Sequence, residues 1–180
     1  WPSALTIFKP SAMGLINRVK DVYRVTDTHI HGFFREHRFL SNYHLHPIEY
    51  EGITYVSTEN AYQAAKLDPG MFQPSGLTKG DFASMNPREA KSRGRAIKLR
   101  WDWLSLLPPE QCIEESPDVV VVRTVRDKIM YDLNVIKFSD PALRELLLAT
   151  GDKYLEETNW WRDDYWGMWE GNGLNKLGRI

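Results

Sequence analysis

The chain has 180 residues, of which 42% are hydrophobic and 26% charged, and its formal net charge at pH 7 is -1. This composition is typical of one globular domain that buries its own core, and it excludes a disordered or fibrous protein. A net charge near zero also excludes the broad basic surface that drives non-specific nucleic-acid binding. The single cysteine precludes an internal disulfide, and no apolar run approaches the roughly 20 residues of a membrane span. We therefore expect a cytoplasmic protein without a membrane partner.

Residues 1–28 carry no clear chemistry beyond a short expected strand at residues 5–8, and we treat them as a variable N-terminal segment before a domain at 29–180. All five histidines fall early in the chain, at His29, His31, His37, His44 and His46. A His-x-His pair on a strand projects to one face and could ligate a metal. Because no cysteine or carboxylate with ligand spacing accompanies these histidines, we expect neither a metal site nor any other cofactor.

The stretch from Ile48 to Lys66 predicts a β-hairpin followed directly by a helix. Apolar and polar side chains alternate on both sides of a Glu51-Gly52 turn, with the larger residues at Ile48, Tyr50, Ile53 and Tyr55. Ser57 and Thr58 are suitable N-caps, and residues 59–66 contain three alanines and no proline or glycine.

Residues three, four and seven positions apart share one face of that helix. This spacing predicts a polar stripe that lines a cleft, made of Glu59, Tyr62, Gln63 and Lys66. The alternative is a capped surface helix in which Glu59 only complements the helix dipole.

Three further helices are expected. Asn86 caps one that begins at Pro87 and carries the basic residues of segment 87–100, and Asp140 caps another that begins at Pro141 and ends before Gly151. The longest is expected to start at residues 116–118, with an apolar stripe at Val122, Val125, Ile129, Leu133 and Ile136. The valine run 119–122 could instead form a buried strand, but the continuing helical period favours a helix.

Charge is unevenly distributed, because segment 87–100 is basic and segment 152–170 is acidic. A basic centre that faces carboxylates suits a phosphorylated ligand whose reaction develops positive charge, although the two runs could also be two solvated faces. The acidic segment contains four tryptophans within ten residues, which either fill the core or stack on a ligand. The glycine-rich segment 171–178 could open a final helix beside a phosphate.

Several short motifs occur in register along the chain: FLSNY at 39–43, STENAYQAAK at 57–66, PREAK at 87–91, DYWG at 164–167 and GLNKLG at 173–178. Together they resemble the NADAR family, also called YbiA-like, over about residues 33 to 178. The resemblance implies an α+β, mainly helical single domain with a small β-hairpin packed on the Glu59 helix. It also implies an N-glycosidase acting on ribosylated amines, including phosphoribosylamino-pyrimidine intermediates of riboflavin synthesis and ADP-ribosyl adducts of guanine.

Hydrolysis of an N-glycosidic bond requires stabilisation of an oxocarbenium-like ribose and activation of a water, both tasks for carboxylates. Glu59 is the first catalytic candidate, and Asp163 is the second because it occupies the place of the acidic residue in the family motif. Its neighbour Asp164 remains an alternative. Glu157 is interpreted as a supporting or structural carboxylate.

The resemblance also implies substrate contacts. Trp103 and Trp166 are the stacking candidates, and Lys66, Arg100 and Asn175 are the phosphate or ribose contacts. The remaining expected substrate-binding residues are Ser41, Asn42, Tyr62, Gln63 and Gly167.

The leading hypothesis is a hydrolase that cleaves the N-glycosidic bond of a phosphorylated ribosylamine or an ADP-ribosyl compound. Its partner is then a small phosphorylated ribosyl substrate, with ADP-ribosylated nucleic acid as a further candidate. The rival hypothesis is a non-catalytic module that binds ADP-ribose or a related nucleotide in the same pocket. A third is a nucleic-acid-binding protein that uses the basic helix. The sequence leaves the oligomeric state open.

Overall fold

The computed structural model describes residues 12–68, 70, 72–116 and 119–180, which form an α+β domain with three small sheets. The expected class is therefore confirmed. The sequence predicted one small hairpin, whereas the described residues contain two hairpins and a three-stranded sheet. The strand expected at residues 5–8 lies outside the described residues. No helix within the described ranges is long and apolar enough to cross a membrane.

The sheets are formed from strands that lie far apart in the chain as well as from neighbours. In the first sheet β2 lies between β1, to which it is antiparallel, and β7, to which it is parallel. The other two sheets are the antiparallel hairpins β3-β4 and β5-β6. The strands are β1 (Arg24–Val25), β2 (His29–His31), β3 (Leu45–Tyr50), β4 (Ile53–Ser57), β5 (Ile113–Ser116), β6 (Val119–Val122) and β7 (Tyr154–Glu156).

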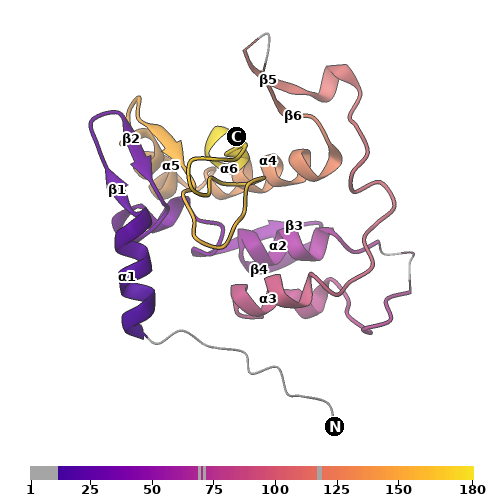
Figure 1. The fold of residues 1–180 in the computed structure, drawn as a ribbon. Helices are drawn as coiled ribbons and strands as arrows, with labels where there is room; N and C mark the ends of the chain where they lie inside the picture. Colours follow the sequence, from indigo (N-terminus) through magenta and orange to yellow (C-terminus); the bar gives the residue numbers. More distant parts are fainter. Residues whose placement is uncertain (1–11, 69, 71, 117–118) are drawn as a thin grey trace.

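Six α-helices and three short 3₁₀ helices complete the described structure. The α-helices are α1 (Ala12–Val22), α2 (Thr58–Ala65), α3 (Pro87–Arg93), α4 (Val125–Lys137), α5 (Pro141–Leu148) and α6 (Lys176–Arg179). The 3₁₀ helices are η1 (Arg35–Leu40), η2 (Gly80–Phe82) and η3 (Pro109–Gln111). Helix α2 lies between α3 and α4 and contacts both (Figure 1).

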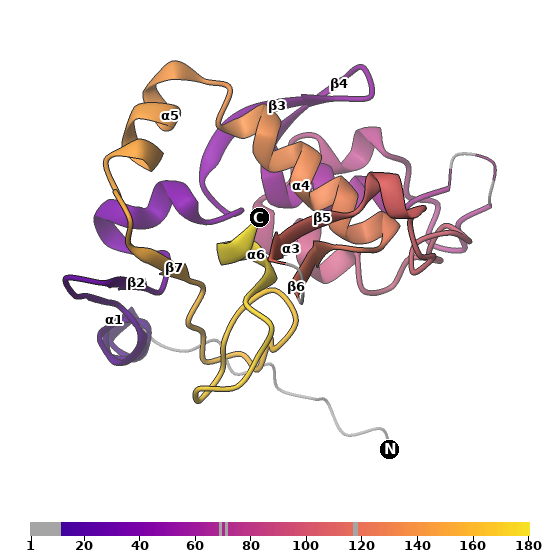
Figure 2. The same ribbon diagram turned by 90° about the horizontal axis from the view of Figure 1, so that it is seen from above.

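The C-terminal segment, residues 157–180, ends near the centre of the molecule with α6 and the C-terminus (Figures 1 and 2). Both views show the C-terminus and α6 between β2 on one side and α4 on the other (Figures 1 and 2). Helix α6 contacts β7, which is the strand that precedes this segment. The two ends of the C-terminal segment are therefore fixed to the same part of the fold.

The predicted hairpin and the helix that follows it are confirmed. Glu51 and Gly52 have φ of 51° and 77°, and Tyr50 pairs with Ile53 across this two-residue turn, which is the backbone that a tight hairpin turn requires. The Ser57 hydroxyl accepts a hydrogen bond from the Asn60 backbone N–H as the N-cap of α2. All eight residues of α2 are buried. The alternative of a capped surface helix was therefore wrong.

The start of the longest helix was predicted wrongly. The valine run forms β6, and α4 begins at Val125 behind a capping box between Thr124 and Asp127. Two of the three residues expected to start the helix, 117 and 118, lie outside the described residues. β-Branched side chains favour a paired strand, and the later capping box fixes the true helix start. The rejected alternative of a buried strand at 119–122 is therefore the one that forms.

The other two predicted helix starts are confirmed, with Asn86 and Asp140 as N-caps whose side chains accept backbone N–H groups. However, α3 ends at Arg93. The prediction that one helix carries the whole basic run was therefore wrong, since Arg95, Lys98 and Arg100 follow in an irregular segment.

Candidate active site

A cavity of about 240 Å³ lies against the polar face of α2. Eight of the predicted site residues line it: Asn42, Glu59, Tyr62, Gln63, Lys66, Trp103, Asp163 and Trp166. We call this space the inner cavity. The rest of its lining is formed by Tyr43, Lys91, Arg95, Arg126, Met130 and Glu157. The cavity thus brings the α2 stripe together with the acidic C-terminal segment and part of the basic run.

Glu59 is fixed in the first turn of α2 by both its backbone and its side chain. Its N–H donates to the Asn42 carbonyl at 2.9 Å. One carboxylate oxygen accepts the Gln63 amide at 2.7 Å, and Gln63 in turn accepts the Lys66 ammonium at 2.6 Å. Burial raises the pKa of Glu59, while the charge of Lys91 opposes this rise. Burial also lowers the pKa of Lys66 to about 8, and the charge of Glu59 opposes that fall.

Asp163 lines the inner cavity from the irregular segment between β7 and α6. Its Oδ1 accepts the Trp166 N–H at 2.9 Å, and its Oδ2 lies 3.9 Å from the Lys91 ammonium. Asp164 is exposed and lies outside the cavity lining. Of the two adjacent carboxylates, Asp163 is the one that faces Glu59.

Glu157 lines the cavity itself, although the sequence suggested only a supporting or structural carboxylate. Burial raises the pKa of Glu157 to about 8, and the negative charge of Asp163 adds to this effect. Its Oε2 is buried and has no hydrogen-bond partner among the described residues. At neutral pH this carboxyl group therefore holds a proton.

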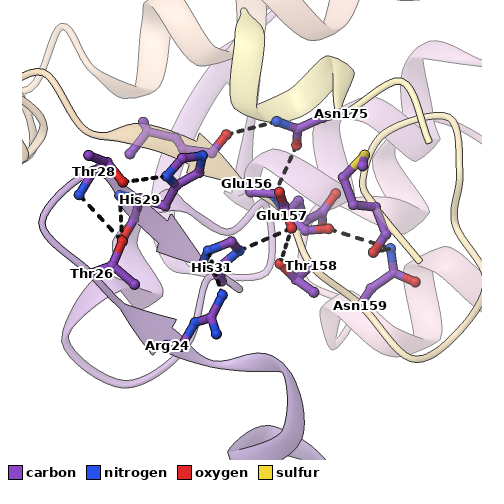
Figure 3. A network of polar contacts seen from close by, with 12 residues as sticks. Arg24, Thr26, Thr28, His29, His31, Glu156, Glu157, Thr158, Asn159 and Asn175 are labelled. Carbon is purple, nitrogen blue, oxygen red and sulfur yellow. Dashed lines mark hydrogen bonds and ion pairs between the residues drawn. The ribbon is translucent and has the colours of Figure 1, made fainter. Parts of the chain in front are cut away.

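The backbone around Glu157 is fixed by residues on three elements (Figure 3). Asn175 accepts the Glu157 N–H at 3.0 Å and donates to the Leu155 carbonyl at 2.8 Å. His31 on the neighbouring strand β2 and Thr158, two residues after Glu156 in the chain, both contact the Glu156 carboxylate, at 3.2 and 2.7 Å (Figure 3). Because β7 ends at Glu156, these contacts set the direction in which Glu157 leaves the sheet.

Two expected substrate contacts, Asn175 and Gly167, support the backbone around Glu157. Asn175 is buried and both ends of its amide are engaged by the backbone of residues 155 and 157. Gly167 lies so close to Glu157 that a Cβ at position 167 would overlap the Glu157 carbonyl oxygen. Neither residue lines the inner cavity. They hold Glu157 in place.

Two more expected contacts also lie elsewhere. The Arg100 guanidinium binds both carboxylate oxygens of Asp102, at 2.5 and 2.8 Å, and lies outside the cavity lining. Ser41 borders an adjacent cavity, and its carbonyl accepts the ammonium of the buried Lys137 at 3.0 Å.

Of the cations that line the inner cavity, the sequence singled out Lys66 but not Lys91, Arg95 or Arg126. Lys91 and Arg95 belong to the basic run, so their position was signalled by composition alone. Arg126 had no signal, because it lies in the first turn of a helix whose start was misplaced. Its guanidinium lies 3.6 Å from the centre of the Tyr165 ring, and its Nε is buried without a hydrogen-bond partner among the described residues.

Unsatisfied polar atoms gather at the inner cavity. Within the described part of the chain, four buried side-chain nitrogen or oxygen atoms have no hydrogen-bond partner, and three of them belong to lining residues: Asn42 Oδ1, Arg126 Nε and Glu157 Oε2. Buried polar groups are nearly always paired in folded proteins. Three exceptions at one cavity indicate a site built for a polar ligand.

The aromatic residues of the site pack mainly against each other. The Tyr62 ring centre lies 5.2 Å from that of Trp103 and 5.6 Å from that of Trp166. Trp103 is only 4% exposed, whereas Trp166 is partly buried. Trp166 therefore has more free ring surface for a ligand than Trp103 has.

A second cavity of about 300 Å³ adjoins the first, and we call it the outer cavity. Four residues line both: Tyr43, Lys91, Arg95 and Glu157. The remaining lining of the outer cavity is formed by Phe33, Phe34, Arg38, Ser41, Arg88, Thr158, Trp160 and Trp161. Together the two cavities form one cleft that runs past Glu157.

The described residues contain no group of three or more histidine, cysteine or acidic side chains placed to hold a metal ion. The rings of His29 and His31 stack with their centres 5.2 Å apart, and His31 contacts the Glu156 carboxylate.

Residues 23–180 match the NADAR domain. The chain is 32% identical over 146 residues to a riboflavin biosynthesis protein of Vibrio vulnificus, a match that covers 80% of this chain and 34% of that protein. It is 30% identical over 144 residues to an N-glycosidase of Nostoc punctiforme, with 78% of each chain covered. The chain thus spans about a third of the Vibrio protein and most of the Nostoc protein.

Similarity extends to YbiA proteins. The N-glycosidase YbiA of Shigella flexneri is 24% identical over 166 residues, which is 91% of this chain and 89% of that protein. The NMR structure of the Escherichia coli protein YbiA superposes with a TM-score of 0.59 at 28% sequence identity, covering 89% of this chain and 84% of that one.

Proposed function

The chain belongs to the NADAR domain family, and on this premise we propose that it is an N-glycosidase that hydrolyses the N-ribosyl bond of a small phosphorylated, nucleotide-like substrate. One observation carries the proposal. Three carboxylates from separate parts of the chain, Glu59, Glu157 and Asp163, line the inner cavity together with Lys91. These charged groups are not needed to fill the core or to cap α2, so their grouping points to a role in the cavity.

The three carboxylates have different surroundings, and this difference suggests their roles. Asp163 is the one paired with Lys91, and its negative charge would stabilise the positive charge that develops on the ribose. Glu59 has a pKa raised by burial, which makes it a better proton acceptor than an exposed carboxylate. It is the candidate base for the attacking water.

Glu157 is the candidate acid. With a pKa of about 8 it holds a proton at neutral pH, and its Oε2 faces no other hydrogen-bond partner among the described residues. A buried carboxyl group with a raised pKa that shares one site with other carboxyl groups is the arrangement that separates acid from base in glycosidases.

The reaction then proceeds as follows. The bond between ribose C1′ and the amine nitrogen breaks, the electron pair stays on nitrogen, and the nitrogen takes the Glu157 proton. Water attacks C1′ and loses a proton to Glu59. The products are the free amine and the ribose with a hydroxyl at C1′, and proton exchange with solvent returns both carboxyl groups to their starting states.

Cations at the cavity supply phosphate contacts in this proposal. Lys66, Lys91 and Arg126 line the inner cavity, and the Arg126 guanidinium offers an unpaired Nε–H. These groups take the role first expected of Arg100, whose guanidinium is engaged by Asp102. The partly buried Trp166 is the candidate surface for the leaving base or pyrimidine ring.

Replacement of Glu59 tests this assignment. Glu59→Gln keeps the side-chain volume and removes the charge, so turnover should fall on the order of a hundredfold or more while ligand binding and fold remain. Turnover is measured by mass spectrometry of the amine released from a panel of ribosylated amines, and binding by isothermal titration with ribose 5-phosphate.

Glu89→Gln is the matched control, because Glu89 is an exposed carboxylate on α3 that only pairs with Arg93. It should leave turnover unchanged. Equal turnover in the Glu59 variant and the wild type would remove Glu59 from the mechanism. Binding without cleavage of any substrate by the wild type would support the non-catalytic nucleotide-binding module instead.

A further inference from the structure

Arg126 lines the inner cavity with a guanidinium group that has no polar partner. Its Nε is buried without a hydrogen-bond partner, and none of the ion pairs in the described part of the chain includes it. The lysines of the same lining are engaged. Lys66 donates to Gln63 at 2.6 Å, and Lys91 lies 3.9 Å from Asp163. Because an unpaired buried donor is costly, Arg126 needs another contact that holds it in place.

The ring of Tyr165 provides this contact. The guanidinium carbon of Arg126 lies 3.6 Å from the centre of the ring, which places the cation on the face of the ring. An arginine that stacks in this way keeps its N–H groups free at the edge of the guanidinium plane, where they can donate to phosphate. Tyr165 itself does not line the inner cavity. It can therefore act on the site only through the side chains that it contacts.

The hydroxyl of Tyr165 is fixed by the fully buried carboxylate of Asp127. Asp127 Oδ1 accepts this hydroxyl, and its Oδ2 accepts the Lys176 ammonium at 3.0 Å. Oδ2 also accepts the N–H groups of Arg123 and Thr124, both at 3.1 Å. Burial raises the pKa of Tyr165 to about 12, so the hydroxyl keeps its proton at neutral pH and donates to Asp127. The ring is thereby fixed relative to the start of α4.

The same hydrogen bonds keep the charge of Arg126 available. Asp127 is the next residue in the chain and carries the opposite charge, but its oxygens are already engaged by Tyr165, Lys176 and two backbone N–H groups. A guanidinium paired with a carboxylate would have to lose that partner before it could bind a phosphate. The cation at the cavity therefore stays free for an anionic ligand.

Tyr165 also contacts a second residue of the cavity lining. Its ring meets the ring of Trp166 edge to face, with the centres 5.0 Å apart and an angle of 87° between the planes. Arg126 belongs to α4, whereas Trp166 belongs to the segment between β7 and α6. One side chain outside the cavity thus touches two lining groups from separate elements.

We propose that Tyr165 is a positioning residue whose ring holds the Arg126 guanidinium with its free N–H groups toward the inner cavity, while Asp127 fixes the ring by its hydroxyl. The proposal rests on the proposed function for the nature of the ligand, a phosphorylated ribosyl compound. It adds a residue that controls how tightly the phosphate is bound without touching it. A Tyr165 that only stabilised the start of α4 would affect unfolding but would not be coupled to Arg126.

A double-mutant cycle tests this coupling by isothermal titration of the full chain with ribose 5-phosphate. Arg126→Gln and Tyr165→Leu should each weaken binding about tenfold, because a hydrogen bond from a charged group is lost or misplaced. The double variant should bind as weakly as Arg126→Gln alone, since the ring acts through the guanidinium. Should Tyr165→Leu fail to fold, Tyr165→Met replaces it in the cycle.

Two further variants separate the ring from general effects on the fold. Tyr165→Phe keeps the ring and loses only the hydroxyl, so it should keep most of the affinity for ribose 5-phosphate. Tyr131→Leu is the control on α4, because Tyr131 lies outside the cavity lining and has the Lys128 ammonium 5.9 Å from its ring centre. It should bind ribose 5-phosphate as the wild type does.

The position of Arg126 is measured without a ligand by ¹H–¹⁵N NMR of the arginine side chains. In the wild type the Arg126 Nε–H signal, identified by its absence in Arg126→Gln, should be shifted upfield because it lies over an aromatic ring. This shift should persist in Tyr165→Phe and vanish in Tyr165→Leu.

Three results would overturn the assignment of Tyr165. These are independent losses that multiply in the double variant, an Arg126 signal that is unchanged when the ring is removed, and failure of the wild type to bind ribose 5-phosphate. A wild type that binds ribose 5-phosphate with the expected coupling but releases no amine from any ribosylated substrate would instead refute the proposed reaction and support the role of Tyr165 in binding.

Discussion

Glu59 and Asp163 face the same cavity, but the segments that carry them are fixed in different ways. Glu59 lies in a helix that follows a tight hairpin, and the cap that starts this helix is Ser57, two residues before it. Asp163 lies in an irregular segment between β7 and α6. Its backbone N–H and carbonyl are both held by the side chain of Asn159, at 3.0 and 2.8 Å.

The site therefore has two halves. The α2 half carries Glu59 and begins at a local hairpin and cap, whereas the C-terminal half, between β7 and α6, carries Asp163 and depends on tertiary contacts. In the α2 half, the Ser57 cap and the hydrogen bonds from Lys66 through Gln63 to Glu59 join residues three or four positions apart, and the Asn42 carbonyl that accepts the Glu59 N–H comes from the preceding loop. In the C-terminal half, Asn175 must reach back to Glu157, and Gly167 must pack against the same residue. Substitutions in the two halves should therefore fail in different ways.

The largest effect expected in the C-terminal half is on catalysis, at Asp163. Asp163→Asn removes the charge that pairs with Lys91 and should lower turnover on the order of a hundredfold. The adjacent Asp164→Asn should have little effect, because Asp164 is exposed and outside the cavity. Steady-state kinetics of the two variants side by side measures the contrast. Equal small losses would leave Glu59 as the one catalytic carboxylate that faces the reacting ribose.

A smaller effect is expected from pH. The pKa of Glu157 is about 8, so if its proton is given to the leaving group, kcat should fall about tenfold for each pH unit above 8. In Glu157→Gln this alkaline decline should disappear, at a lower overall rate. A pH–rate profile of both proteins decides this. An unchanged alkaline decline in the variant would assign it to another group, such as Lys66, whose pKa is also about 8.

The same group has a consequence for stability. The folded chain keeps the Glu157 proton up to about pH 8, while the unfolded chain loses it near the ordinary pKa of 4.5. The stability that this proton gives to the folded chain is therefore complete below pH 4.5 and is lost as the pH rises to 8. Denaturant unfolding between pH 5 and 8 should show a smaller decline with pH for Glu157→Gln than for the wild type.

The smallest expected effects are on the stability of each half of the site. Ser57→Ala removes the N-cap of α2 and should lower the free energy of unfolding by about 1 kcal/mol, with kcat nearly unchanged in the folded protein. Asn175→Ala leaves two backbone groups unpaired and should cost about 1–3 kcal/mol for each, and kcat should fall as well. Chemical denaturation and kinetics measure both. Asn172→Ala, at an exposed position nearby, is the control.

This contrast also explains what the sequence could predict. Short-range signals gave the hairpin turn at Glu51-Gly52, the cap at Ser57 and the stripe from Glu59 to Lys66, and each formed as expected. The valine run was misassigned because its helical spacing and its strand propensity conflict. The later capping box at Thr124 and Asp127 determines which of them prevails.

The unpredicted parts of the site share a physical reason. Lys91, Arg126 and Glu157 face the cavity because of packing between elements far apart in sequence, which no local pattern reports. For the same reason Asn175 and Gly167 were read as ligand contacts, whereas their contacts are with the backbone around Glu157. The resemblance implied that Arg100 contacts phosphate or ribose, and its guanidinium binds the carboxylate of Asp102, two residues on.

The central claim, that carboxylates from both halves hydrolyse an N-ribosyl bond, is tested most directly by product analysis in labelled water. The wild type is incubated with an N-ribosyl nucleotide in H₂¹⁸O, quenched rapidly and examined by mass spectrometry. We expect the free amine without label and the ribosyl product with one ¹⁸O at C1′, and we expect neither from Glu59→Gln at matched times. Intact substrate bound by the wild type, or cleavage that continues in Glu59→Gln at the wild-type rate, would contradict the account.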